Sequence, residues 1–192
     1  MLSGKFKINL HNNKRVMRME IALKLSVITL DEINEYKDDL ELFLSSIFDF
    51  ECHIDINPEF RCAVVIERSG RICACGLGYE REMYQNQKCF KGGIVGGIAV
   101  SSECRGQGLG KAVLEAIDRH LLSLRVDCSF LFAYEPKVYQ SSGYYVLSAP
   151  IYYFDKQQSK WNQFVYRGGM VKSYSSRQLS EKLVIEFKGC LY

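Results

Sequence analysis

The fold is decided by one stretch near the middle of the chain, Ile98-Ala99-Val100-Ser101-Ser102-Glu103-Cys104-Arg105-Gly106-Gln107-Gly108-Leu109-Gly110-Lys111. Its first residues are apolar and typical of a strand end, and a short polar turn and three glycines at alternate positions follow. Apolar residues then recur at i, i+3, i+4 and i+7 from Leu109 to Leu124, which predicts an amphipathic helix of about four turns. The stretch therefore predicts a strand that leads through a glycine-rich loop directly into a helix.

This loop has the chemistry of an anion site. The first turn of a helix leaves several backbone N–H groups without acceptors, and the helix dipole adds partial positive charge there. Glycines at 106, 108 and 110 let the backbone approach a ligand closely, and Arg105 and Lys111 add formal positive charge. Together these features predict a site for a phosphate or pyrophosphate, the plain alternative being a glycine-rich helix entrance that binds no ligand.

Two common phosphate-binding loops do not fit the spacing. The dinucleotide fingerprint Gly-x-Gly-x-x-Gly would need its third glycine one residue later than Gly110, and it usually follows the first strand of a domain. A Walker loop needs Ser or Thr after its Gly-Lys pair, and residue 112 is Ala. Both loops are therefore excluded on spacing.

The elements around the loop predict a mixed α/β fold. A capping box at Thr29 and Glu32 and the hairpin turn Ser69-Gly70 mark two of the boundaries, and the interval from Glu80 to Lys91 is polar. A further strand is expected in the last twenty residues. One sheet with helices on its faces accommodates this order. The patterning predicts helices over 30–48, 109–124 and 136–142 and strands over 21–28, 62–66, 72–77, 93–100, 128–133, 144–147, 151–154 and 164–171.

Length and composition indicate an ordinary globular chain. Its 192 residues are 47% hydrophobic and 24% charged, with three prolines, so we expect a basic arm or short strand over 1–20 and a single domain over 21–192. The net charge is only +3 and no Lys/Arg-rich run is present, which argues against nucleic-acid partners. No apolar run reaches about 18 residues, which argues against a membrane span.

The eight cysteines indicate a reducing environment rather than a disulfide framework. No Cys-x-x-Cys pair occurs, and Cys73-Ala74-Cys75 has no His nearby in sequence, so no metal site is expected. Most cysteines lie in apolar runs such as Cys62-Ala63-Val64-Val65-Ile66, which predicts buried free thiols. We therefore expect the protein in the cytoplasm.

Two landmarks in the chain resemble one family. Arg105-Gly106-Gln107-Gly108-Leu109-Gly110 matches the Arg/Gln-x-x-Gly-x-Gly/Ala signature of the GNAT superfamily of acyl-CoA-dependent N-acetyltransferases. Val138-Tyr139-Gln140-Ser141-Ser142-Gly143-Tyr144 is similar to the family's second landmark, at about the family's separation. The resemblance is strong over 93–147 and extends to the order of elements from residue 21. The hairpin 62–77, the glycine-rich strand and the strands beyond 150 look most like the aminoglycoside 2′-N-acetyltransferases and the nodulation-type acyltransferases.

The resemblance implies a GNAT-type sandwich and a place for acetyl-CoA. In such enzymes a central, mostly antiparallel sheet splays between its fourth and fifth strands, here 93–100 and 128–133, and helices cover both faces. Gly96 and Gly97 fit the bulge that the fourth strand carries there. The pantetheine arm would pair with that strand and the pyrophosphate would lie on the loop. The implied coenzyme-binding residues are Ile98, Ala99, Val100, Arg105, Gly106, Gln107, Gly108, Leu109, Gly110 and Lys111.

The implied reaction is direct attack of a neutral primary amine of a small molecule on the thioester carbonyl. Tyr139 matches the position of the family's usual general acid. A phenol suits that role because it is protonated at neutral pH and can protonate a departing thiolate. Tyr134 and Tyr144 are interpreted as packing residues.

The general base is less defined than the acid. The strand 93–100 contains no titratable group, unlike the corresponding strand of many relatives. Glu80 and Glu82 could reach the slot as substrate-side carboxylates, although exposed surface positions suit them as well. His120 is interpreted as structural, and a proton transfer relayed by water is the preferred picture.

Three functions fit these patterns. The first is the small-molecule N-acetyltransferase, and the second is a protein or peptide N-acetyltransferase, or a longer-chain acyltransferase, on the same scaffold. The third is a module that binds acyl-CoA without turnover, against which Arg105, the three glycines and Tyr139 argue together. The aromatic residues of 144–166 could roof a closed pocket, or form core or homodimer contacts.

Overall fold

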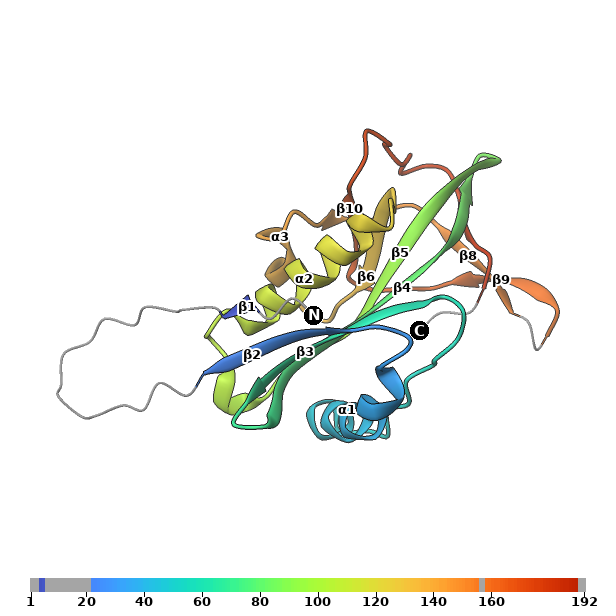
Figure 1. Cartoon of the computed structure of the whole chain (residues 1–192). Coiled ribbons are helices and arrows are strands. Elements are labelled where there is room, and N and C mark those ends of the chain that lie inside the picture. Colours follow the sequence, from blue (N-terminus) through green and yellow to red (C-terminus); the bar gives the residue numbers. More distant parts are fainter. Residues whose placement is uncertain (1–3, 6–21, 156–157, 190–192) are drawn as a thin grey trace.

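A computed structural model describes residues 4–5, 22–155 and 158–189, which form one twisted mixed sheet with helices on both faces (Figure 1). Figure 1 shows α1 and α2 on opposite sides of the sheet. The helices are α1 (Ile33–Phe48), α2 (Leu109–Ser123), α3 (Lys137–Gln140) and the 3₁₀ turn η1 (Ser102–Cys104). The strands are β1 (Gly4–Lys5), β2 (Leu23–Ile28), β3 (Phe60–Arg68), β4 (Arg71–Gln85), β5 (Lys88–Val100), β6 (Cys128–Phe132), β7 (Tyr145–Val146), β8 (Ile151–Asp155), β9 (Lys160–Phe164), β10 (Gly169–Ser173) and β11 (Ile185–Phe187).

The sheet follows the chain for most of its width. The order is β1-β2-β3-β4-β5-β6-β10-β7, and neighbouring strands are antiparallel except for the parallel pair β5–β6. A side branch consists of β11, which pairs with β4 and β8, and of β9, which pairs with β8. The expected mixed, mostly antiparallel sheet is confirmed. Of the predicted arm 1–20, only Gly4–Lys5 lies within the described residues, as a short strand on β2.

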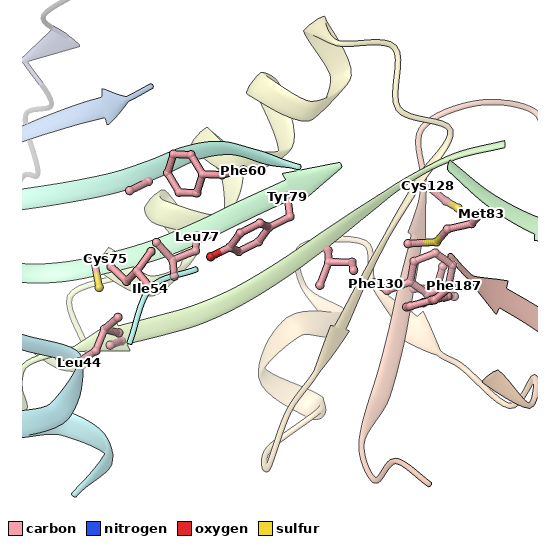
Figure 2. Packing of buried hydrophobic residues seen from close by; sticks show 14 of the residues in the cluster. Leu44, Ile54, Phe60, Cys75, Leu77, Tyr79, Met83, Cys128, Phe130 and Phe187 are labelled. Atoms are coloured by element: carbon pink, nitrogen blue, oxygen red, sulfur yellow. The ribbon is translucent and has the colours of Figure 1, made fainter. Parts of the chain in front are cut away.

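The apolar residues divide into two cores, one on each face of the sheet. The core on the α1 side contains Leu40 and Leu44 of the helix and Tyr79 of β4, and it extends along the sheet to Phe130 and Phe187 (Figure 2). The core on the α2 side packs the apolar stripe of α2 against β3, β4 and β5. The central strands are apolar on both faces because helices cover both sides.

Two tight hairpins connect β3, β4 and β5. Ser69-Gly70 forms the first turn, as predicted, with φ of 53° and 74°. Asn86-Gln87 forms the second with φ of 51° and 61°, and such left-handed pairs match the twist of antiparallel strands. The interval 80–91, expected only to be polar, is therefore a hairpin; one face of it is buried through Met83 and Phe90.

The strands β3, β4 and β5 are longer than predicted, and two other segments begin or divide differently. Helix α1 begins at Ile33 rather than at 30, because residues 30–32 form a turn in which the Glu32 carboxylate accepts a hydrogen bond from the Thr29 N–H at 3.3 Å. The segment 164–171 is two strands, because the chain turns at Gly168 (φ 60°). The strand β9 then pairs with β8, and β10 pairs with β6.

The feature that creates room for a site is the separation of β5 from β6. The two strands pair only from Gly92 to Ile94, so beyond Ile94 this edge of β5 has no strand partner among the described residues. An extra residue in β5, opposite the Cys75–Leu77 step of β4, forms a bulge at Gly97, whose φ is 58°. The predicted splay and bulge are both confirmed.

Candidate active site

A cavity of about 350 Å³ lies where the open end of β5, the loop 105–108, the first turn of α2 and α3 meet. Three walls therefore come from three parts of the sequence: a strand, a loop that continues into a helix, and a short helix some 30 positions further on. The cavity is lined by Ile98, Val100, Cys104, Arg105, Gly106, Gly108, Leu109, Gly110, Lys111, Leu114, Val138, Tyr139, Ser141 and Ser142.

The loop wall presents hydrogen-bond donors and positive charge. The backbone carbonyl of Gly108 accepts from Ala112 N–H at 3.0 Å, and the preceding N–H groups, those of Leu109, Gly110 and Lys111, have no acceptor in the described part of the chain. Gly106 and Gly108 have φ of 73° and 77°, and a Cβ at either position would meet nothing within 4 Å among the described residues. The space in front of the loop is open, as close approach of an anion requires.

The strand wall is formed by Ile98 and Val100, which line the cavity from β5. Ala99, between them, is buried in the core on the α1 side and does not line the cavity. The Val100 carbonyl oxygen accepts a long hydrogen bond, 3.4 Å, from Nε of Arg105, which ties the strand end to the loop.

The third wall carries Tyr139, on the single turn of α3. Pro136 precedes this helix and Gly143 follows it with φ of 87°, as the sequence predicted. Tyr139 is half-buried and lines the cavity, and its hydroxyl makes no hydrogen bond to other described residues. Burial raises the pKa of Tyr139 above the ordinary phenol value, so this hydroxyl is protonated at neutral pH.

A buried polar network connects the segment that follows α3 to α2, β6 and β10. Tyr144 shares a hydrogen bond of 2.7 Å with Ser129 of β6 and donates to Oδ1 of Asp118 at 3.1 Å. Tyr174 also donates to Asp118. Lys172 of β10 lies 2.7 Å from Oδ2 of Asp118 and donates to the Ser142 carbonyl oxygen at 2.7 Å. We call Asp118, Ser129, Tyr144, Lys172 and Tyr174 the Asp118 network.

The sequence analysis missed this network, although one signal was present. Asp118 lies four residues after Leu114 and three before Leu121, within the apolar stripe of its helix. A carboxylate at such a position needs buried partners. Tyr144 is buried as expected, whereas Tyr134 is not a packing residue, because its side chain is 97% exposed.

Four of the predicted or considered residues lie away from the cavity. Gln107 is exposed, and its amide donates to the Glu103 carbonyl oxygen at 3.3 Å. Glu80 binds Arg61 and Lys91, both at 3.1 Å, near the C-terminal end of α2 and not at its N-terminus. Glu82 is exposed two positions further along β4, and His120 lies in the last turn of α2.

Register explains where the two glutamates lie. Glu80 is paired with Gly93, and a Cβ on Gly93 would meet Leu121 Cδ1 at 2.9 Å, so Glu80 belongs to the end of α2 opposite the glycine-rich loop. Ion pairing with Arg61 and Lys91 accounts for its partial burial.

A splayed sheet with a glycine-rich helix entrance beside the splay defines the class of acyl-CoA N-acyltransferase folds. Residues 56–147 match the family model for the acetyltransferase (GNAT) domain. Among solved structures, a GNAT family N-acetyltransferase from Escherichia coli, YhbS in complex with CoA, superposes with a TM-score of 0.62 at 12% identity over 93% of this chain and 94% of that one. The region 56–147 thus resembles a GNAT acetyltransferase domain, and the described residues have the fold of the GNAT N-acetyltransferases.

Two further structures share the fold at similarly low identity. Escherichia coli ElaA has a TM-score of 0.54 at 14% identity, over 79% of this chain and 99% of that chain. A probable N-acyltransferase from Enterococcus faecalis has a TM-score of 0.55 at 12% identity over 67% of this chain. This chain spans only 33% of that protein's length. None of the helices within the described ranges is long and apolar enough to cross a membrane.

Proposed function

We propose that the protein is an acetyl-CoA-dependent N-acetyltransferase that acts on a primary amine of a small molecule. The observation that carries this proposal is the cavity itself: an open strand edge, a donor-rich helix N-terminus and a protonated tyrosine converge on one space of about 350 Å³. These are the groups that a thioester on a pyrophosphate-bearing arm would need for binding and for protonation of its leaving sulfur.

The residues present fit acetyl-CoA as co-substrate. Gly106, Gly108 and the free N–H groups of the first turn of α2 would hold the pyrophosphate, with Arg105 and Lys111 beside it. The free edge of β5 beyond Ile94 would add the pantetheine arm as an extra strand, since its backbone groups have no strand partner there among the described residues. When bound, the thioester supplies an activated acetyl group.

Tyr139 would act as the general acid. Tyr139 lines the cavity, and its raised pKa would keep the proton in place until a thiolate develops beside it. The backbone N–H groups at the bulge in β5 are the candidate donors to the carbonyl oxyanion.

The proton of the attacking amine would leave through water. No carboxylate or imidazole is among the described residues that line the cavity. Glu80, the closest carboxylate candidate from the sequence, is held by Arg61 and Lys91 at the far end of α2. A water relay therefore suits this site better than a direct side-chain base.

The aromatic residues that could have roofed the pocket instead form core contacts. Phe132, at the end of β6 just beyond the splay, contacts Phe164 at 4.9 Å and Tyr166 at 5.3 Å between ring centroids. Tyr166 is fixed in turn, because its hydroxyl donates to the Ala149 carbonyl oxygen at 2.5 Å. All three rings pack against the core on the α1 side, and none of them lines the cavity.

The test is a screen for release of free coenzyme A thiol from acetyl-CoA in the presence of polyamines, aminoglycosides, amino acids and peptides. We expect turnover with at least one small primary amine and no turnover in the variant Gly108→Glu. Turnover with peptides alone would assign the second function, and longer acyl-CoA donors run in parallel define the acyl chain. Binding of acetyl-CoA without turnover on any amine would favour a non-catalytic module.

A further inference from the structure

Two cysteines of one buried cluster lie beside the cavity wall, and the proposed reaction uses neither. Cys104, in η1 directly before Arg105, lines the cavity although its side chain is only 3% exposed. Cys73, on β4, is 5% exposed and belongs to the same buried cluster as Cys104, and its thiol donates to the Ile66 carbonyl oxygen at 3.2 Å. The backbone connects the same two segments, because Ser101 N–H donates to the Cys73 carbonyl oxygen at 2.9 Å.

The surroundings of the two thiols differ. Nη1 of Arg68 lies 3.8 Å from the sulfur of Cys104. A hydrogen bond from Ser101, and further ones from Arg68 and Cys73, lower the pKa of Cys104 below its ordinary value. Burial, and then the charge of Cys104, raise the pKa of Cys73 to about 11. Cys104 therefore carries the thiolate character of the pair, and it is the thiol that faces the cavity.

We propose that Cys104 is a peroxide-reactive thiol, that Cys73 is its resolving thiol, and that the two form an intramolecular disulfide. Low-pKa thiols that are reachable and lie beside a second thiol are the ones that oxidise in this way. The other buried thiols of the described chain, Cys62, Cys75 and Cys128, do not line the cavity.

The chemistry balances with a peroxide as the oxidant. The Cys104 thiolate attacks one peroxide oxygen, the O–O bond breaks, and the leaving alkoxide or hydroxide takes up a proton; the sulfur becomes a sulfenic acid by a two-electron oxidation. The Cys73 sulfur then attacks the sulfenic sulfur, the S–O bond breaks, and hydroxide leaves with the Cys73 proton as water. The first step removes the negative charge of Cys104, which is one cause of the raised pKa of Cys73.

Coenzyme in the cavity would protect the pair, a consequence that rests on the proposed function. Cys104 is reached through the same cavity that the pyrophosphate loop lines. At acetyl-CoA concentrations 100 times its dissociation constant, only about 1% of the sites stay empty, so oxidation should slow by about 100-fold. The thiols would then report on coenzyme occupancy.

The experiment treats the full chain with hydrogen peroxide, blocks remaining thiols, and maps tryptic peptides without reduction. Cleavage after Arg71, Arg81, Lys91 and Arg105 places Cys73 in peptide 72–81 and Cys104 in peptide 92–105. We expect these two peptides to be joined in the majority of oxidised chains. This disulfide link between the two peptides, which we call the join, should be absent in Cys104→Ser and in Cys73→Ser.

Cys75→Ser is the matched control, because Cys75 lies in the same peptide but faces the core on the α1 side. The join should survive in this variant. Loss of the join in Cys75→Ser with retention in Cys73→Ser would overturn the assignment, as would oxidation of Cys104 to sulfinic acid with no join in wild type.

Acetyl-CoA, which carries no free thiol, separates this proposal from the proposed function. If acetyl-CoA raises the melting temperature and slows joining, both stand. If it raises the melting temperature and joining proceeds at the unprotected rate, access through the cavity is wrong. If it leaves the melting temperature unchanged while the disulfide still forms, the coenzyme site is wrong and the thiol pair stands.

Discussion

The side-chain nitrogen of Lys172 lies 2.7 Å from Oδ2 of Asp118, and the same nitrogen donates to the Ser142 carbonyl oxygen at 2.7 Å. One ammonium group thus joins α2 to the residue that ends the turn of α3. Since both helices line the cavity, this ion pair helps to set the distance between its two helical walls. Tyr139 lies on the wall that the ion pair holds.

Loss of this ion pair should therefore reduce catalysis through Tyr139. We expect Lys172→Met to lower kcat in the wild-type background but to have little further effect in Tyr139→Phe. Coupling between residues of one network typically amounts to 0.5–3 kcal/mol, or about 2- to 150-fold in rate. The double-mutant cycle in kcat measures it. Equal effects in both backgrounds would mean that Lys172 has only a structural role.

The same substitution should also cost stability. Lys172→Met leaves the Asp118 carboxylate without its cation, and loss of one partner of a buried pair costs about 3–5 kcal/mol; because the Lys172 side chain is 25% exposed, we expect about 3 kcal/mol or less. Adding Asp118→Asn should recover part of that loss. Lys24→Met is the control: it breaks a surface pair whose lysine is 61% exposed, so it should change the free energy of unfolding much less. Urea unfolding measures all three.

Tyr139→Phe removes the proposed acid and keeps the ring. General acid catalysis contributes typically about 10²- to 10⁴-fold, so kcat should fall on that scale while coenzyme affinity changes little. Because the pKa of Tyr139 is raised, the alkaline limb of kcat should lie above about pH 10 in wild type and be absent or displaced in the variant. A variant that turns over at the wild-type rate would leave solvent as the proton source.

Gly108→Glu should abolish the rise in melting temperature that acetyl-CoA causes. It places a carboxylate in front of the donors of α2 at a position with open space, so the fold should survive. Gly70→Glu is matched to it, with φ of 74° against 77° and equally open space, but it lies in the β3–β4 turn. Both variants should lose similar stability, and Gly70→Glu should keep the coenzyme-induced shift. Retained binding in Gly108→Glu would place the pyrophosphate elsewhere.

The free energy of unfolding should fall at alkaline pH, first through buried thiols and at higher pH through buried tyrosines as well. Burial raises the pKa of the Cys62, Cys75 and Cys128 thiols to about 12, and it raises the pKa of Tyr144 and Tyr174 as well. Below about pH 9 the folded and unfolded chains hold the same protons on these groups. Above it, the unfolded chain ionises first, so stability falls with rising pH, by up to about 1.4 kcal/mol per pH unit for each group.

The tyrosines should join the thiols above about pH 10. Tyr174→Phe should therefore flatten the fall in the free energy of unfolding only above that pH. Tyr134→Phe, at a fully solvated ring, should leave the slope as it is. Denaturant titrations from pH 7 to 11 distinguish the two, and an unchanged slope in Tyr174→Phe would contradict the burial of its hydroxyl.

The sequence could predict features that depend on residues adjacent in the chain. The loop 105–111 is recognisable because its glycines, its charges and the following helix are adjacent in the chain, and the turns at Ser69-Gly70 and Gly143 carry equally local signals. Only the family resemblance predicted that the three walls enclose one cavity. Val138 and Tyr139 are far from β5 in the sequence, and no local pattern indicates that they lie near it in the fold.

The remainder depended on pairings distant in sequence. The partners of Asp118 lie 26 and 54 positions away at Tyr144 and Lys172, so no local pattern brings them together. The placement of Glu80 followed from the register of β4 on β5, which the second hairpin turn fixes. The contact of Cys73 with Cys104 likewise required the fold.

The bulge in β5 reverses which side chains the end of this strand offers to each face. Before the bulge, Ile94 faces the α1 side, so strict alternation would have sent residues 98 and 100 to that side as well. The inserted residue turns Ile98 and Val100 toward the cavity and Ala99 into the opposite core instead. If Gly97 instead took a regular place in the ladder, the two sets would be exchanged: the methyl group of Ala99 would face the cavity, and two branched side chains would be forced into a filled interior. The left-handed conformation of one glycine in the bulge therefore decides which side chains of β5 line the cavity and which enter the opposite core.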